Sequence, residues 1–202
     1  MSFEYSMNVS FKARFIQNAS VLRINKDNSL KETPVSFVKM SELDTEDMYA
    51  MNKIANNYKR AFNEQMSKKD DPDSENYAES IRNNFNHIYN NPDMRGYKDF
   101  FALTTQQEGF EYIDNQKVLG LAETFNDVLG DFLEVRFLQT NPLHKFGENT
   151  REFKKIGTAI LDCLRNYFKG RTIYLQADYN VIDFYKKYGF EVLKENNMIF
   201  KA

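Results

Sequence analysis

The chain has 202 residues, of which 42% are apolar and 15% aromatic, so it can bury the core of one globular domain. Lys and Arg number 27 and Asp and Glu 29, a net charge of −2 that excludes a global field attracting nucleic acid or an anionic membrane. The single cysteine, Cys163, cannot form an intramolecular disulfide, which fits a reducing cytoplasm. No apolar run approaches the roughly 20 residues of a membrane span. No His and Cys spacing typical of a zinc site occurs.

Residues 1–33 are predicted to form an N-terminal extension folded as a β-hairpin. Apolar and polar residues alternate over residues 9–15, which is typical of a strand. Residues 21–24 are the predicted partner strand, and the polar cluster at 25–29 is a turn. The main domain is predicted to span residues 34–202.

The main domain is predicted to contain strands and helices in the order β, α, α, β, β, β, α, β, α, β. Strands are predicted where apolar residues alternate or run together, and helices where they recur every three to four residues. The predicted strands are residues 35–39, 100–104, 116–125, 132–140, 171–177, 190–193 and 197–200. The predicted helices run from Asp44 or Thr45 to Phe62, over residues 74–89, from Thr150 or Arg151 to Phe168, and over residues 178–188. This order predicts an α/β (α+β) fold, a mixed sheet of about seven strands flanked by four helices.

A polar loop followed by a glycine-marked helix start suggests a phosphate-binding site. The N-terminus of a helix presents unpaired N–H groups and a partial positive charge, which together favour an anion such as pyrophosphate. Gly157 would let the backbone come close to that ligand, and Thr158 would add a hydroxyl. Lys154 and Lys155 add positive charge. The alternative interpretation is an amphipathic helix whose glycine permits close packing.

The predicted helix over residues 178–188 carries the second motif. Three residues separate the pair Phe184-Tyr185 from the pair Gly189-Phe190, and the glycine stands at the position that ends a helix. Asp178 is a good residue to cap the start of this helix. The alternative interpretation is a surface helix whose aromatic side chains belong to the core.

The two motifs and their spacing resemble the acyl-CoA-binding half of the GNAT superfamily of N-acetyltransferases. The resemblance covers residues 35–202 and implies a centrally splayed sheet, with acyl-CoA entering beside the strand at 132–140. The first motif departs from the family pattern Arg/Gln-x-x-Gly-x-Gly/Ala in either of two alignments. One places Glu152 at the basic position and Lys155 at the first glycine; the other places Lys154 at the basic position and Gly157 at the first glycine. The second motif departs from the pattern by having Asp178 in place of asparagine and Val181 in place of alanine.

The resemblance also implies which residues bind and react. The residues implied to contact acyl-CoA are Leu138, Gln139, Thr140, Lys154, Lys155, Ile156, Gly157, Thr158, Ala159, Asp178, Asn180, Phe184 and Tyr185. Tyr185 is implied to be the general acid that protonates the departing thiolate. The base is Glu134, Glu123 or a water molecule. Glu134 and Arg136 are predicted to share one face of their strand, with Phe137 on the other, and an ion pair between them is the alternative role for Glu134.

The activity implied is that of an acyl-CoA-dependent N-acyltransferase in the cytoplasm. It would move the acetyl group of acetyl-CoA to a primary amine by direct attack in a ternary complex, without a metal ion. Two alternatives stay open: a catalytically silent acyl-CoA-binding regulatory domain, and a toxin- or effector-type acetyltransferase acting on protein or aminoacyl-tRNA. The net charge argues against nucleic acid as a partner, no membrane partner is expected, and a homodimer is left open. The amine acceptor cannot be identified from the sequence.

Overall fold

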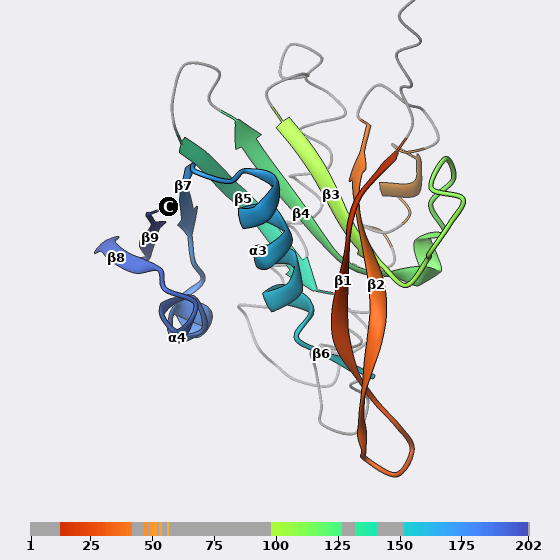
Figure 1. Ribbon diagram of the computed structural model, residues 1–202. Coiled ribbons are helices and arrows are strands. Elements are labelled where there is room, and N and C mark those ends of the chain that lie inside the picture. Colours follow the sequence, from red (N-terminus) through yellow and green to blue (C-terminus); the bar gives the residue numbers. More distant parts are fainter. Residues whose placement is uncertain are drawn as a thin grey trace, which may run out of the picture.

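Nine strands form one sheet in the part of the chain that the computed structural model describes, residues 13–41, 47, 49–51, 53, 56, 98–126, 132–140 and 152–201 (Figure 1). The strands are β1 (Arg14–Ile24), β2 (Leu30–Met40), β3 (Lys98–Thr104), β4 (Val118–Asn126), β5 (Phe132–Thr140), β6 (Phe153–Lys154), β7 (Thr172–Gln176), β8 (Glu191–Lys194) and β9 (Asn197–Phe200). Their order across the sheet is β6-β1-β2-β3-β4-β5-β7-β9-β8.

The sheet is mixed, as the sequence predicts. Strands β5 and β7 run parallel, and every other neighbouring pair is antiparallel. A parallel pair needs a crossover connection, which the helix between β5 and β7 supplies. All seven predicted strands of the main domain are present, and β1 and the two-residue β6 bring the total to nine. The predicted α/β (α+β) class with a mixed sheet is therefore confirmed.

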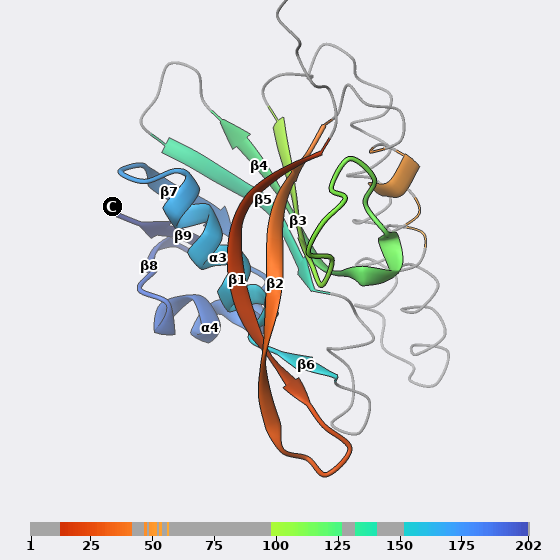
Figure 2. The ribbon, with the colours of Figure 1, turned by 45° about the vertical axis from the view of Figure 1, so that its right-hand side comes forward.

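Two of the four predicted helices lie in the described residues. They are α3 (Ile156–Tyr167) and α4 (Ile182–Lys187), and both pack on the same face of the sheet (Figures 1 and 2). Single turns of 3-10 helix precede β4 (η2, Asn115–Lys117) and α4 (η4, Tyr179–Val181). Residues 47, 49–51, 53 and 56 are helical and fall in the first predicted helix. The rest of that helix and the predicted helix at 74–89 lie outside the described residues. Neither α3 nor α4 is long and apolar enough to cross a membrane.

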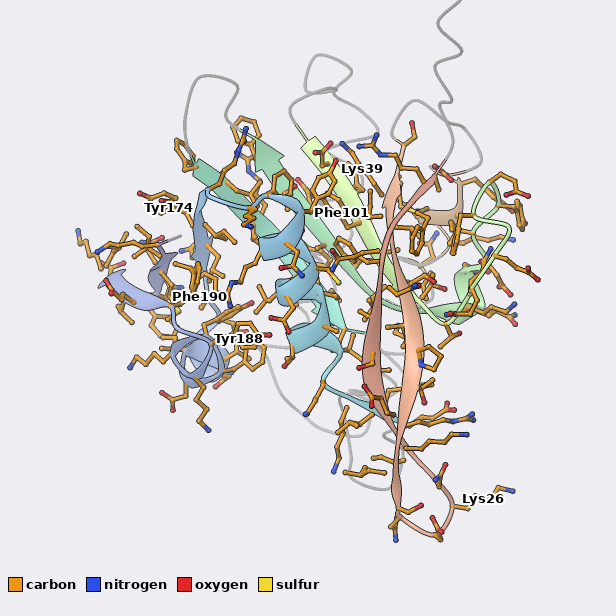
Figure 3. The ribbon with its side chains drawn as sticks, in the orientation of Figure 1. Lys26, Lys39, Phe101, Tyr174, Tyr188 and Phe190 are labelled. Atoms are coloured by element: carbon orange, nitrogen blue, oxygen red, sulfur yellow. The ribbon has the colours of Figure 1, made fainter. Side chains whose placement is uncertain are left out.

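Two apolar clusters cover the two faces of the sheet. The larger lies under α3 and α4, and the smaller packs against Met51 on the opposite face. Strand alternation divides neighbouring residues between them, so that Phe37 enters the larger cluster and Val38 the smaller. Phe101 stacks on Phe37 with ring centroids 5.1 Å apart and lies between β3 and α3 (Figure 3). Together these contacts fix α3 against the middle of the sheet.

The sheet opens between β5 and β7. Their pairing begins at Phe132 with Thr172 and, within the described residues, ends at Val135 with Leu175, although β5 continues to Thr140. The opening coincides with a β-bulge, because the register between β4 and β5 shifts so that Arg136 is the extra residue. A central splay beside a bulge is what the resemblance implies for this strand.

The bulge also corrects one prediction about β5. Phe137 was predicted to share a face with Leu133 and Val135, on the basis of regular alternation. Leu133 and Val135 lie in the larger cluster, whereas Phe137 packs against the smaller one. The extra residue at Arg136 shifts the alternation by one, so Phe137 turns to the opposite face.

The predicted N-terminal hairpin is wrong in its pairing. Residues 14–24 form one continuous strand, β1, and its partner is β2, joined through the predicted turn at 25–29. A small register shift between Phe15 and Gln17 interrupts the pairing without ending the strand. The polar residues in the middle of β1 hide its continuity in the sequence. The predicted boundary between residues 33 and 34 falls inside β2, and the division of the chain into two parts stays a prediction.

The helices also begin later than predicted. The predicted start of the third helix at Thr150 or Arg151 is wrong, because β6 occupies Phe153–Lys154 and α3 begins at Ile156. Asp178 does act as a cap, but for the 3-10 turn η4, and α4 starts at Ile182. Gly189, which follows α4, has a φ of 91°, the left-handed conformation predicted for it.

Candidate functional site

Within the residues that the structure describes, the start of α3 has N–H groups without an acceptor in the helix and no side-chain cap. Its first internal hydrogen bond joins the Ala159 N–H to the Lys155 carbonyl at 2.9 Å, so the N–H groups of Ile156, Gly157 and Thr158 have no acceptor within the helix. No acidic residue lies in the first turn, and no side chain caps it. This end of the helix can therefore accept an anion.

Backbone conformation favours one of the two alignments of the first motif. Lys155 precedes α3 with φ 66° and ψ 19°, the left-handed conformation in which glycine is the preferred residue. This favours the alignment that places Lys155 at the first glycine and Glu152 at the basic position. Glu152 itself pairs with Arg23 of β1, at 2.7 Å between Oε1 and Nη2. The side chains of Lys154 and Lys155 are exposed.

Gly157 lies where α3, β5 and α4 meet. A Cβ atom placed on it would lie 3.5 Å from Phe184 Cζ and 3.7 Å from Leu138 Cδ2, which are ordinary van der Waals distances. Close packing therefore does not require a glycine here, contrary to the alternative interpretation of the motif. The missing side chain leaves room beside Phe184 and Leu138, two residues implied to contact acyl-CoA.

Aromatic contacts join α4 to the first turn of α3. The Tyr188 hydroxyl donates a 3.0 Å hydrogen bond to the Thr158 carbonyl, and Figure 3 shows Tyr188 between the two helices. Phe184 stacks on Tyr188 with ring centroids 5.9 Å apart. Burial raises the pKa of the Tyr188 phenol, and the negative charge of the neighbouring Asp162 adds to this rise. Tyr188 was not among the residues predicted to form the site, although it stands directly before the helix-ending Gly189.

Tyr185 is buried beneath this aromatic contact. Its ring meets Phe184 edge-on at 5.1 Å and Phe190 at 5.6 Å between centroids. Burial raises the pKa of Tyr185 to about 12, so the phenol keeps its proton at neutral pH. Among the described residues no hydrogen bond of its hydroxyl is found, so the hydroxyl is not already committed to another group there.

The end of β5 contributes mainly main-chain atoms. Leu138 packs against the larger cluster, and Gln139 is 2% exposed, with its amide donating a 2.6 Å hydrogen bond to the Thr140 carbonyl. Ile156 and Ala159 of α3 are likewise buried. The side chains of Gln139, Ile156 and Ala159 are thus buried, while that of Leu138 is only partly buried beside Gly157.

The two candidate bases lie in different surroundings. Glu123 is 3% exposed and stands opposite Phe137 at the bulge, on the same face of β4 as Leu121. Glu134 accepts a 3.0 Å charged hydrogen bond from Arg136 Nε, which is the alternative role predicted for it. Arg136 also lies over the Phe125 ring, 4.4 Å from its centroid. Glu134 is therefore occupied, and Glu123 is the buried carboxylate beside the bulge.

Asp178 and Asn180, two of the residues implied to contact acyl-CoA, lie at the exposed start of η4. Asp178 accepts a 3.2 Å hydrogen bond from the Asn180 N–H, and both side chains are exposed at the start of η4. Asp178 therefore has a structural role as a cap.

Burial raises the pKa of Cys163 to about 11, which keeps this thiol protonated in the core. The described residues hold no group of three or more His, Cys, Asp or Glu side chains suited to a metal ion.

The chain is similar in fold to solved N-acetyltransferases. The PaiA N-acetyltransferase from Thermoplasma acidophilum, solved in complex with coenzyme A, is 18% identical; the match covers 83% of this chain and 99% of that chain, with a TM-score of 0.48. Tetrahymena GCN5 is 14% identical over 79% of this chain and 90% of that one, with a TM-score of 0.47. Aminoglycoside 6′-acetyltransferase type Ii is 14% identical over 81% and 92%, with a TM-score of 0.44.

No protein-family model and no curated protein sequence matches the chain. Two of these three structures are named as acetyltransferases. Identities and scores of this size do not assign an activity, so the function has to be argued from the site of this chain.

Proposed function

We propose that this protein is an acyl-CoA-dependent N-acyltransferase that moves an acetyl group from acetyl-CoA to a primary amine. One observation supports the proposal: three features lie at the same place. They are the uncapped start of α3, Gly157, which packing does not require to be a glycine, and the end of β5 that is not paired with β7. The helix start suits pyrophosphate, and an opening between two strands suits the extended pantetheine arm.

Each chemical step has a group in this chain that could perform it. Main-chain N–H groups near the end of β5 would stabilise negative charge on the carbonyl oxygen of the thioester. Glu123, directly or through water, would accept the proton that the ammonium group must lose before attack. The amine nitrogen then bonds to the acyl carbon, the carbon–sulfur bond breaks, and the Tyr185 phenol gives its proton to the leaving thiolate. The second proton of the attacking nitrogen leaves as the amide forms and, passed on through water, restores the Tyr185 phenol.

A silent acyl-CoA-binding domain is the second candidate, because Lys155 and Asp178 depart from the family motif and the Asp178 side chain caps η4. Both candidates require CoA binding, and only the enzyme requires turnover. Consumption of acetyl-CoA over a panel of amines and lysine-containing peptides separates them. Turnover with any acceptor supports the enzyme, and binding without turnover across the panel supports the silent domain.

Gly157→Glu tests the position of the CoA site. The substitution adds bulk and negative charge where the phosphates would lie, so calorimetry should detect no CoA binding. Gly157→Gln is the matched control, since it adds nearly the same bulk without charge and should retain more affinity. Circular dichroism checks that both variants fold. Unchanged affinity for CoA in folded Gly157→Glu protein would refute this placement.

A further inference from the structure

Gly120 lies in β4 beneath the first two turns of α3. It stands opposite Thr140 of β5 and Leu103 of β3, in the interior of the sheet. It is not one of the glycines with positive φ, so its backbone conformation is open to other residues. The reason for a glycine must therefore lie in the space above it.

That space is filled by the two segments to which the proposed function assigns acyl-CoA. A Cβ atom on Gly120 would lie 2.8 Å from Ile160 Cδ1 and 3.0 Å from Ile156 Cγ2, both in α3. It would also lie 2.9 Å from the main-chain oxygen of Gln139 in β5. Side-chain rotation could relieve the first contact, but a main-chain oxygen can be relieved only by moving the strand.

Gly120 and Gly157 thus have opposite surroundings. At Gly157 an added Cβ would make only ordinary contacts, while at Gly120 it would displace α3, β5 or both. The glycine on the sheet sets how closely the helix start approaches the strand end, and the glycine on the helix leaves room for a ligand.

We propose that Gly120 is a positioning residue of the CoA site, fixing the separation between the start of α3 and the end of β5. This inference rests on the proposed function, because the two segments would hold the pyrophosphate and the pantetheine of one molecule. A ligand that bridges two segments loses affinity when their separation changes, even if each segment keeps its own structure.

Gly120→Ala tests the inference, with CoA affinity measured by calorimetry and stability by thermal unfolding. We expect CoA affinity to fall between about 10-fold and 100-fold, or about 1.4 to 2.8 kcal/mol of binding free energy, because a shift of either segment misaligns the pyrophosphate contacts with the pantetheine contacts. Met40→Ala is the matched control. It removes buried apolar volume from β2 in the cluster on the opposite face of the sheet, so it should lower stability while CoA affinity stays close to wild type.

A second-site variant tests the mechanism. Ile160→Val deletes the atom nearest the added methyl group, so the Gly120→Ala/Ile160→Val protein should regain part of the lost affinity. If Gly120→Ala does not fold, the comparison of Ile160→Val with the double variant carries the test.

Three results would count against the inference. A loss below about 10-fold, or an equal loss in Met40→Ala, would overturn it and leave the proposed function intact. Failure of both Gly120 variants to fold would also overturn it, since the glycine would then serve the fold as a whole. Wild-type protein that does not bind CoA would refute the proposed function itself, and this inference with it.

Discussion

At the scale of single residues, Tyr185 shows how packing can prepare a side chain for chemistry. Two aromatic neighbours bury its ring, and burial alone raises the pKa of its phenol to about 12. A phenol with a raised pKa keeps its proton at neutral pH and is a proton donor at the moment a thiolate forms. Because the ordinary pKa of a thiol is about 8.5, transfer from this phenol is uphill, so the proposed step requires the bound ligand to lower the pKa of Tyr185.

Tyr185→Phe removes only the hydroxyl and leaves the ring contacts in place. If Tyr185 is the general acid, turnover on one accepted amine should fall by about 10²–10⁴-fold. Acetyl-CoA affinity should change little, because the proton matters only as charge develops on sulfur. Tyr179→Phe, which changes an exposed tyrosine, is the control. Turnover of Tyr185→Phe within about twofold of wild type, a loss far smaller than that range, would leave the proton to water.

The same residue gives a prediction about stability at alkaline pH. The folded-state pKa of Tyr185 lies above its ordinary value of 10, so between pH 10 and about 12 the unfolded chain releases a proton that the folded protein keeps. Its contribution is therefore fully present below pH 10 and is lost as pH rises through that window. The rise in pKa from 10 to about 12 corresponds to at most about 3 kcal/mol of unfolding free energy.

Denaturant unfolding from pH 9.5 to 11.5 measures this effect. Tyr185→Phe should lose less stability across the range than the wild type, whereas Tyr179→Phe should follow the wild type. Parallel curves for wild type and Tyr185→Phe would show that the buried phenol does not control alkaline unfolding.

At the scale of elements, the sequence predicts the strands of the main domain well and the segment before α3 poorly. The bounds predicted for β5 match the structure, because its apolar residues run between polar flanks. The two residues of β6 are too few to show any periodicity, and they are a strand only because β1 lies beside them. The helix predicted to begin at Thr150 or Arg151 therefore wrongly included the residues of β6.

The residues of the candidate site also differ in whether the sequence could predict them. Gly157, Phe184 and Tyr185 could be predicted because they stand in two motifs with known spacing. Gly120 and Tyr188 could not, since their roles arise from contacts between β4, α3 and α4 that no local pattern encodes. A glycine inside a strand does signal close approach of another segment, and that signal was present at Gly120. The side on which Phe137 lies depends on the bulge at Arg136, which alternation alone cannot reveal.

At the scale of the whole molecule, β1 is joined to the core and to the start of α3. Val21 is 1% exposed in the larger cluster, and Arg14 Nη2 donates a 2.7 Å hydrogen bond to the Tyr167 hydroxyl of α3. The Ile24 N–H donates a 2.8 Å hydrogen bond to the Glu152 carbonyl, beside the pairing of β1 with β6. The N-terminal strand thus holds the loop that leads into α3.

These contacts predict that a chain lacking residues 1–29 cannot keep a stable fold. Removing β1 would expose the cluster around Phe37, leave β2 with an unpaired edge, and free the loop before α3. We expect the shortened protein to lose a cooperative thermal transition and to bind an apolar dye, whereas full-length Val21→Ala should still unfold cooperatively at a lower temperature. If residues 1–33 are instead a separable extension, the shortened chain should unfold within a few degrees of the full-length protein. Melting curves of the full-length and shortened proteins therefore separate the two cases. Removing a strand that contacts β2, β6 and α3 should destabilise the rest of the molecule, whereas removing an independent hairpin should not.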